Sequence, residues 1–299
     1  MLKLLFSLIG LSIFFLLFWN LVDRESFYSS FSNLDFNKLF FAFIIVLIVP
    51  FITSLRIYFF LLSFNIKRNY NRCYKATFAS LSLNILLPAR GGDIIKALFL
   101  SEKKNEYTSI IGVTILERLV DITVLSLFAL FSALIVNNKL IIFLSMIPVM
   151  LCIFIFFLFK TIGSFPFVNT KLKSAFNLFK NSPVIPRYVI LGVLCSIASW
   201  SFVMLILYLL FQSASVNISL IETIVYSPLS IFIGLLPLSI SGIGTRDSAF
   251  VYFLPSYNIE AILCATFLYT ILAYWTLGIL GSLFCGTEVL RKLKLIVKK

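Results

Sequence analysis

The chain has 299 residues, of which 61% are hydrophobic and only 12% are charged, and phenylalanine alone occurs 34 times. Soluble domains carry about 25% charged residues, so this composition excludes that class and indicates an integral membrane protein. The net charge of +13 is carried by short loops and the C-terminal end. That distribution is typical of membrane topology signals, and we expect no nucleic-acid partner.

Histidine is absent, and the five cysteines are spread along the chain without a Cys-x-x-Cys pair. The first fact removes the commonest general base and metal ligand. Isolated cysteines inside apolar runs are expected to be small buried side chains. We therefore expect no metal site and no cofactor.

Eight apolar segments follow one another along the chain, each near the roughly 20 residues that a helix needs to cross a membrane. They are 4–22, 39–62, 75–100, 109–136, 139–159, 187–211, 220–254 and 259–284. The first is too long for a signal-peptide core and is expected to remain as an anchor.

Two of the eight segments are interrupted by polar, Pro- and Gly-containing sequence. The third contains Pro88-Ala89-Arg90-Gly91-Gly92-Asp93, and the seventh contains Pro237 and Gly242-Ile243-Gly244-Thr245-Arg246-Asp247. Irregular backbone at membrane depth must be enclosed by protein or line a wet cavity. These segments are therefore the places to look for function.

Basic residues decide whether the interrupted segments cross the membrane, because Lys and Arg in short loops favour the cytoplasmic side. If all eight segments cross, ten basic residues lie outside and eleven inside; if both interrupted segments turn back, eighteen lie inside and three, Arg24, Lys38 and Lys139, outside. Helix from Lys75 to Pro88 would also span only about 21 Å, which reaches mid-membrane. Both segments are predicted to be re-entrant hairpins.

The predicted fold is an all-α polytopic membrane protein with six full transmembrane helices, two re-entrant broken-helix hairpins and cytoplasmic termini. The two hairpins fall in units of opposite orientation, an inverted repeat of the kind that many transporters use to build a substrate site. The predicted parts of this single membrane domain (1–299) are an anchor helix and outer loop (1–36), repeat one (37–136, hairpin 75–101), a connecting helix and basic loop (137–186), repeat two (187–284, hairpin 220–254) and a basic tail (285–299).

Several ionisable residues lie inside these apolar segments, where each costs roughly 2.5–3.5 kcal/mol at a helix centre and needs a partner. Glu117 and Asp121 are four residues apart on one helix face and are predicted partners for Arg90 or Arg246. Alternatively, the charges only neutralise one another and fix the hairpins. Arg56 is expected to extend toward the headgroups at the inner end of its helix.

Arginine suits an anionic headgroup because its planar fork binds phosphate in two places and stays charged. Glycines allow backbone amides to approach a phosphate closely. The predicted substrate-binding residues are Arg90, Arg246, Asn84, Gly91, Gly92, Asp93, Gly242, Gly244 and Asp247, supported by the charges of Glu117, Arg118, Asp121 and Arg56.

Four blocks of these residues occur in an order that resembles the lysylphosphatidylglycerol synthase transmembrane region, also called the flippase-like membrane protein family. The blocks are Leu55-Arg56; Asn84, Pro88-Ala89-Arg90-Gly91-Gly92-Asp93 and Lys96; Glu117-Arg118-Leu119-Val120-Asp121; and Pro237 with Gly242-Ile243-Gly244-Thr245-Arg246-Asp247. The resemblance covers most of the chain and implies a role in moving lipids between leaflets. Bifunctional members add a soluble catalytic domain after the membrane part, whereas this sequence stops shortly after its last apolar segment, so aminoacyl transfer is not expected.

The predicted function is therefore a lipid flippase or transporter of the cytoplasmic (inner) membrane, and not an enzyme. Its substrate would be an anionic phospholipid, a glycolipid or a polyprenyl-phosphate-linked lipid. One alternative is an accessory subunit of a separate synthase or glycosyltransferase; another is a membrane-embedded enzyme using Asp93, Glu117 and Asp121 as acid, base or metal ligands. A homo-oligomer also stays open, because lipid-facing and protein-facing apolar surfaces have the same composition.

Overall fold

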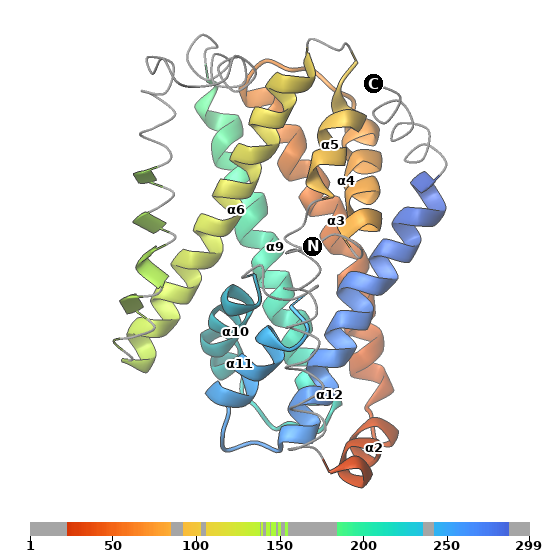
Figure 1. Ribbon diagram of the computed structural model, residues 1–299, viewed down its shortest axis with the longest axis vertical. Helices are drawn as coiled ribbons and strands as arrows, with labels where there is room; N and C mark the ends of the chain where they lie inside the picture. Colours follow the sequence, from red (N-terminus) through yellow and green to blue (C-terminus); the bar gives the residue numbers. More distant parts are fainter. Residues whose placement is uncertain are drawn as a thin grey trace, which may run out of the picture.

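The computed structural model describes residues 23–84, 92–102, 106–137, 184–235 and 242–286, with scattered positions between 139 and 154. The regular structure in these ranges is helical (Figure 1). The elements are α2 (Arg24–Ser32), α3 (Phe36–Ser63), α4 (Tyr70–Asn84), α5 (Asp93–Leu100), α6 (Tyr107–Val136), α9 (Pro186–Ser213), α10 (Leu220–Gly234), α11 (Thr245–Phe253), α12 (Ile259–Thr270) and the π-helix η4 (Ile271–Thr276).

Four helices are long and apolar enough to cross a membrane. They are α3, α6, α9 and the continuous helix Ile259–Gly286 that contains α12 and η4. Each corresponds to an uninterrupted apolar segment of the sequence, so the all-helical membrane fold is confirmed at this level. Of the other two predicted crossings, 4–22 lies outside the described residues and 139–159 is described at only a few positions.

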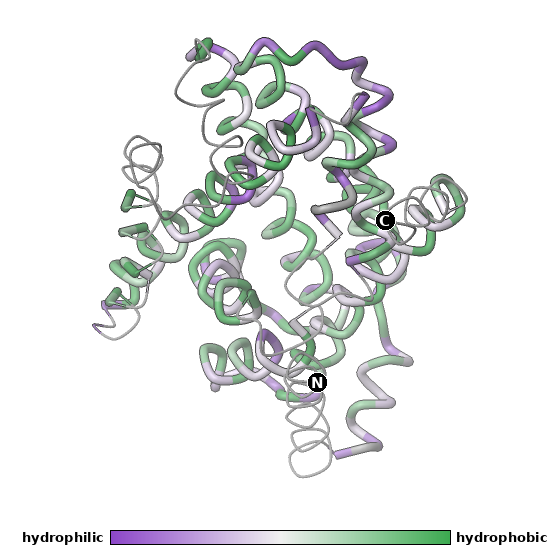
Figure 2. The backbone as a smooth tube through the Cα atoms, turned by 45° about the horizontal axis from the view of Figure 1, so that its top comes forward, coloured by the Kyte–Doolittle hydropathy of each residue, from purple (hydrophilic) through white to green (hydrophobic). Residues whose placement is uncertain are grey.

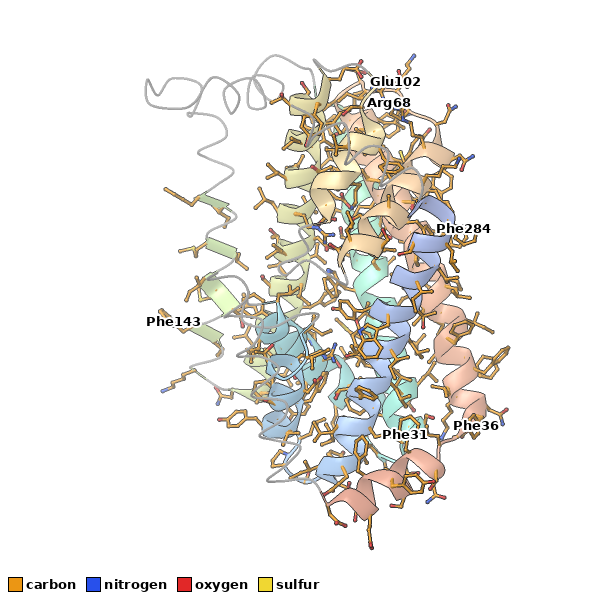
Figure 3. All side chains as sticks on the ribbon, turned by 45° about the vertical axis from the view of Figure 1, so that its right-hand side comes forward. Phe31, Phe36, Arg68, Glu102, Phe143 and Phe284 are labelled. Atoms are coloured by element: carbon orange, nitrogen blue, oxygen red, sulfur yellow. The ribbon has the colours of Figure 1, made fainter. Side chains whose placement is uncertain are left out.

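The outer surfaces of the long helices carry large apolar side chains. Phe36 is 71% exposed, Phe131 60% and Phe284 73%, and Figure 3 shows Phe36 and Phe284 pointing away from the bundle. Figure 2 shows mostly hydrophobic helices, with a long hydrophilic stretch at the top of the view and shorter ones elsewhere. A soluble protein rarely exposes so much apolar surface, so this exterior is suited to contact with lipid.

Asp35 caps the start of helix α3, and its carboxylate accepts hydrogen bonds from the backbone amides of Asn37 (3.0 Å) and Lys38 (3.3 Å). The bond from the Lys38 amide holds the pKa of this carboxyl below its usual value. The helix ends before Asn65, which has a left-handed φ of 57°. Helix α9 ends in the same way before Ser215, with a φ of 61°.

Helices α3 and α9 pack antiparallel along most of their length and are joined at both ends by equivalent hydrogen bonds. The amide of Asp35 donates to the carbonyl of Ser213, and the amide of Ile185 donates to the carbonyl of Ser63, both at 3.0 Å. The two donors, like the two acceptors, are 150 residues apart in the sequence. The pair is therefore related by a pseudo-two-fold axis.

Helices α4 and α5 form an antiparallel pair after α3. At the open end, Arg68 Nε donates to the Leu100 carbonyl and Arg72 Nε to the Phe99 carbonyl, both at 2.8 Å. At the closed end, the amide of Gly92 donates to Asn84 Oδ1 at 3.0 Å. The two arginines satisfy carbonyls that a helix end leaves without partners, so they hold the pair together.

Helices α10 and α11 form a second antiparallel pair after α9. The tip brings Gly234 close to Arg246, and the open end brings Tyr257 Oη to Glu222 Oε1 at 3.0 Å. Figure 1 shows this pair near the opposite end of the bundle from α4 and α5. The order of helix, helix pair, helix thus occurs twice in the described residues.

The buried apolar side chains divide into two main clusters. One is centred on α9 and the helices that follow it, and the other on the end of α3, the α4–α5 pair and the start of α6. Val120 on α6 packs against both. The polar groups of the interior lie near this junction.

Gly281 provides a test of how closely the last long helix packs against α4. A Cβ at this position would lie 3.1 Å from the Ser82 amide nitrogen and closer still to the Phe78 carbonyl oxygen. Because both are backbone atoms, Gly281→Ala should lower the free energy of unfolding by about 1–3 kcal/mol, measured by thermal unfolding in detergent. Gly286→Ala is the control, since no atom lies within 4 Å of its added Cβ; equal changes in both variants would contradict this packing.

Candidate functional site

A buried carboxylate pair on α6 meets an arginine from α3. Arg56 Nη2 lies 3.0 Å from Glu117 Oε1, and its Nη1 is paired with Asp121 Oδ1. Arg56 is 2% exposed, Glu117 0% and Asp121 4%. Arg56 thus points into the protein interior and does not extend to the headgroups, because two carboxylates one helical turn apart attract it there.

Helix α5 brings a second set of charges to the same place. Lys96 Nζ lies 3.1 Å from Glu117 Oε2 and 3.5 Å from Asp93 Oδ1. Arg118 pairs with Asp93 and, through Nη1 at 3.0 Å, with Asp121 Oδ2. Three cations and three carboxylates therefore form one ion-pair network across α3, α5 and α6.

The tip of the α4–α5 pair adds polar neighbours to this network. Ser80 Oγ donates to Asp93 Oδ1 at 2.8 Å, and Asn84 Oδ1 accepts the Gly92 amide. A Cβ on Gly92 would clash with the backbone carbonyl oxygen of Ser80 and lie 3.1 Å from the Asn84 amide nitrogen, so glycine is needed for this approach. Asn84, Gly92 and Asp93 thus lie together at the tip of the pair, and their binding of a substrate stays a prediction.

A cavity of about 120 Å³ adjoins the network. It lies among α3, α4, α5, α6, α9 and the last long helix. Its lining residues fall into four groups: charged (Arg56, Lys96, Arg118, Asp121), polar (Thr53, Thr77, Ser80, Asn84, Ser199), aromatic (Trp200, Tyr269, Tyr274) and aliphatic (Val46, Val49, Pro50, Leu81, Val203, Ile206, Ala273, Leu277). Such a mixture deep among apolar helices is typical of a ligand site.

The cavity lies on the pseudo-two-fold axis of α3 and α9. Four of its lining positions on α3 have their counterparts, 150 residues later, in the lining of α9. The pairs are Val49 and Ser199, Pro50 and Trp200, Thr53 and Val203, and Arg56 and Ile206. The two units thus supply matching backbone positions to one site but different side chains.

Irregular helix geometry occurs on two sides of this cavity. Pro50 lies inside α3, where it has no amide to donate to the preceding turn. On the last long helix, Ala273 and Tyr274 lie in the π-helix η4. Single π-turns occur frequently at functional sites, because the extra residue per turn re-aims side chains.

Arg246 occupies a separate buried site at the tip of the α10–α11 pair. Its Nη2 donates to Asp247 Oδ1 and Thr270 Oγ1, both at 2.7 Å, and to the Thr266 carbonyl at 3.0 Å. Its guanidinium carbon lies 4.9 Å from the ring centre of Tyr269, whose side chain also lines the cavity. Nη1 has no hydrogen-bond partner among the described residues.

The glycines of this tip make room for Arg246 and bond to its partner. Gly242 and Gly244 have φ values of 79° and 87°, a left-handed region that other residues rarely adopt. The amide of Gly244 donates to Asp247 Oδ2 at 3.0 Å. These residues therefore surround the Arg246 pair, as the sequence grouping suggested.

Comparison with known proteins places this site within a membrane protein family. Residues 4–281 match the family described as the lysylphosphatidylglycerol synthase transmembrane region. The chain belongs to this family. It is also similar to a UPF0104 membrane protein of Methanocaldococcus jannaschii, with 26% identity over 220 residues that cover 67% of this chain and 92% of that protein. The family resemblance inferred from the residues is thus confirmed, and the chain is a multi-pass membrane protein.

The ion pairs of Glu117 and Asp121 differ from those predicted from the sequence, which were with Arg90 or Arg246. Glu117 and Asp121 bind Arg56, Lys96 and Arg118, whereas Arg246 binds Asp247. Arg246 is not among the described residues that line the cavity. Arg90 and Gly91 lie outside the described residues, so a shared cavity for Arg90 and Arg246 stays a prediction.

Sequence reasoning missed Lys96 and the aromatic wall as parts of the site. Lys96 stands in one of the family blocks but was not among the predicted site residues, although its position three residues after Asp93 places both on one face of α5. Trp200 gave no local signal because aromatic residues are frequent throughout this chain. Its indole Nε1 donates to the Asp121 carbonyl at 3.2 Å, which holds α9 against α6.

Arg56→Met should strongly destabilise the protein, because it removes the shared partner of Glu117 and Asp121. Breaking a buried ion pair from one side typically costs about 3–5 kcal/mol. Thermal unfolding in detergent should show this loss, and Arg56→Met with Glu117→Gln should recover part of it. Lys38→Met is the control, since Lys38 and Asp35 form a pair that is 40% exposed on each side, and exposed pairs contribute about 0–1 kcal/mol.

Proposed function

We propose that this protein moves lipids with an anionic headgroup between the leaflets of the cytoplasmic membrane and holds the headgroup in the cavity on the α3–α9 axis. The main support is the charge of the cavity wall. Arg56, Lys96 and Arg118 line it together with one carboxylate, that of Asp121. An anionic group is therefore favoured there over a neutral or cationic one.

The position of the other two carboxylates strengthens this inference. Glu117 is fully buried behind Arg56 and Lys96, and neither it nor Asp93 is among the described lining residues. Buried carboxylates that are covered by cations keep those cations in place at membrane depth. The network as a whole is neutral, but its three cations and only one of its three carboxylates face the cavity, so an anionic ligand would meet mainly the cations.

The size of the cavity suits a headgroup. A water molecule needs about 10–15 Å³ of such volume, so 120 Å³ corresponds to about ten water positions. That space accommodates a phosphate and a small attached group, while the acyl chains would stay in the surrounding lipid. The apolar exteriors of the long helices provide the surface along which those chains would move.

The arrangement of the helix pairs supports a transport mechanism. We propose that α4–α5 and α10–α11 are re-entrant hairpins from opposite membrane faces, within six membrane crossings and with both termini in the cytoplasm. The cavity lies on the axis between the two units, as substrate sites do in inverted-repeat transporters. Movement of one unit against the other would open it toward each leaflet in turn.

Arg118→Gln provides a direct test of this function. Asp93 keeps Ser80 and Lys96 as partners, and Asp121 keeps Arg56. Because the Arg118 side chain is 22% exposed and that of Arg56 only 2%, this change should cost less stability than Arg56→Met. The loss of a charged hydrogen-bond donor, worth about 1.5–3 kcal/mol, should reduce translocation at least about tenfold. The measurement is protein-dependent movement of fluorescent phosphatidylglycerol in proteoliposomes.

Lys38→Gln is the matched control, because it removes a positive charge that lies away from the cavity. It should leave translocation unchanged, and Arg118→Lys should restore part of the activity. If Arg118→Gln and wild-type protein move the lipid at the same rate, or if neither moves any anionic lipid, the proposed function is wrong. The second result, together with co-purification of a synthase, would favour an accessory subunit.

Arg90 and Arg246 are predicted to contribute to the same translocation by different routes. Arg90→Ala should lower the transport rate without changing the unfolding temperature. Arg246→Ala should lower both, because it leaves buried Asp247 without its ion pair. The same proteoliposome assay and thermal unfolding separate the two effects; full transport activity in both variants would exclude these arginines from the site.

A further inference from the structure

The first half of the last long helix is attached to the α10–α11 pair. Arg246, at the tip of that pair, donates from Nη2 to Thr270 Oγ1 at 2.7 Å and to the Thr266 carbonyl at 3.0 Å. Thr270 Oγ1 also donates to the Thr266 carbonyl, at 3.2 Å. Helix α12 is therefore bonded to the second unit just before η4 begins.

The second half of the same helix packs against the first unit. A Cβ on Gly281 would clash with the Phe78 carbonyl of α4, so the two backbones touch there. One turn later, Cys285 Sγ donates to the Lys75 carbonyl at 3.5 Å. Figure 1 shows this helix running from the α10–α11 pair toward the α4–α5 pair. A movement of one unit against the other must therefore bend the helix or break one of its attachments.

The π-helix η4 (Ile271–Thr276) lies between these two attachments. Its wide turn is bridged by Thr276 Oγ1, which donates to the Ile271 carbonyl five residues earlier at 3.0 Å. A π turn is a rare departure from regular helix geometry and a common place for helices to kink. Ala273 and Tyr274 of this turn line the cavity. The helix is thus easiest to bend beside the cavity.

The matching helix of the first unit, α6, is regular at the equivalent positions. Residues 121–126 lie 150 residues before 271–276 and are α-helical. Lys96 and Arg246 are likewise 150 residues apart, and each binds the long helix that ends its own unit. Lys96 meets the Glu117 carboxylate, whereas Arg246 meets a neutral carbonyl and a hydroxyl group, and such bonds are weaker than ion pairs. The last long helix is therefore more deformable than α6.

Two tyrosine rings connect Arg246 and η4 to the cavity. The guanidinium carbon of Arg246 lies 4.9 Å from the ring centre of Tyr269, and the rings of Tyr269 and Tyr274 meet edge to face with centres 5.9 Å apart. Both tyrosines line the cavity. A change at the tip of the α10–α11 pair or in η4 would therefore move part of the cavity wall.

We propose that η4 is the hinge about which the two units move, and that Arg246 is the positioning residue that holds it. On bending, α12 moves with the α10–α11 pair, residues 277–286 move with α4, and Tyr274 shifts in the cavity. A few residues at one irregular turn are enough to absorb such a motion. The hinge rests on the proposed function, because it supplies the movement that transport between leaflets requires.

Hydrogen–deuterium exchange tests the hinge independently of transport. The full-length protein is placed in vesicles of phosphatidylglycerol and phosphatidylcholine, and exchange is followed by mass spectrometry. Backbone amides of residues 272–277 should exchange at least about tenfold faster than those of residues 122–127, the equivalent stretch of α6, because easily bent helix opens more often. Equal rates in the two stretches would overturn the proposal.

Deleting Ala273 removes the extra residue of the π turn. Because a π turn holds one residue more than an α turn, the shortened helix should become regular and keep both attachments in place. The unfolding temperature should stay equal or rise, and exchange at the turn should fall to the rate in α6. Translocation of phosphatidylglycerol should fall at least about tenfold, while its binding, measured by native mass spectrometry, is retained.

Deleting Ile279 is the control for this variant. Ile279 is 57% exposed and lies in the regular helix after η4. Its removal turns Gly281 and Cys285 away from α4 by about 100°, so the unfolding temperature should fall. If the Ala273 deletion destabilises the protein equally, or if it translocates lipid at the wild-type rate, η4 is not the hinge.

Thr270→Val tests the role of Arg246 without changing its charge. The variant loses the hydroxyl group that Arg246 binds but keeps the size of the side chain, so exchange in η4 should rise roughly threefold to tenfold. Thr123→Val is the matched control, since Thr123 Oγ1 donates within α6, at 2.7 Å to the Leu119 carbonyl, and it should leave exchange in η4 unchanged. Unchanged exchange in Thr270→Val would remove Arg246 from the hinge.

The hinge and the proposed function fail in different ways. Fast exchange in η4 without any lipid translocation by the wild-type protein would contradict the transport function and support the hinge. Translocation together with equal exchange in η4 and α6 would support transport and refute the hinge.

Discussion

Glu117 is the point on which the interior of this protein depends. Its carboxylate accepts hydrogen bonds from two nitrogen atoms of Arg56 on α3 and from the ammonium group of Lys96 on α5. Three helices, α3, α5 and α6, therefore meet at one negative charge. In a poorly solvated interior such a carboxylate is strongly unfavourable without these partners. The pairing therefore fixes α5 against α3 and α6, and it places two of the three lining cations at the cavity. The same ion pairs thus determine both the packing of these helices and the charges at the cavity wall.

The α4–α5 pair is bonded at both of its ends, and this gives the cavity a firm wall. Arg68 and Arg72 join the open end, and Asn84 and Gly92 join the tip. Figure 3 shows Arg68 and Glu102 at one end of the molecule, away from the buried charges. Because hydrogen bonds join α4 and α5 at both ends of the pair, the pair is suited to move as a unit. A change in the shape of the cavity would then arise from a shift of the pair relative to α9 and α12.

The sequence predicted the long helices well, because about 20 apolar residues have few alternatives to a membrane-spanning helix. Asn84, Gly92 and Asp93, which the sequence placed in one interrupted segment, do lie close together, but their predicted role in substrate binding stays a prediction. The sequence did not predict which cation meets which carboxylate. Arg56 was assigned to the headgroup region because sequence gives the depth of a residue but not the direction of its side chain. Ion pairs between distant helices depend on packing, which one sequence does not encode locally.

The pseudo-two-fold axis relates two units that carry different charges at the cavity. Position 56 on α3 is arginine, whereas its counterpart on α9 is Ile206, and both line the cavity. The first unit thus supplies the charges and the second an apolar and aromatic surface, while the cation of the second unit, Arg246, is neutralised separately by Asp247. Two similar units have kept a common backbone geometry but divided the chemistry. In the proposed function, a headgroup on the axis would meet a cationic donor side and an opposite side of mainly ring and aliphatic surface, and this difference would orient it.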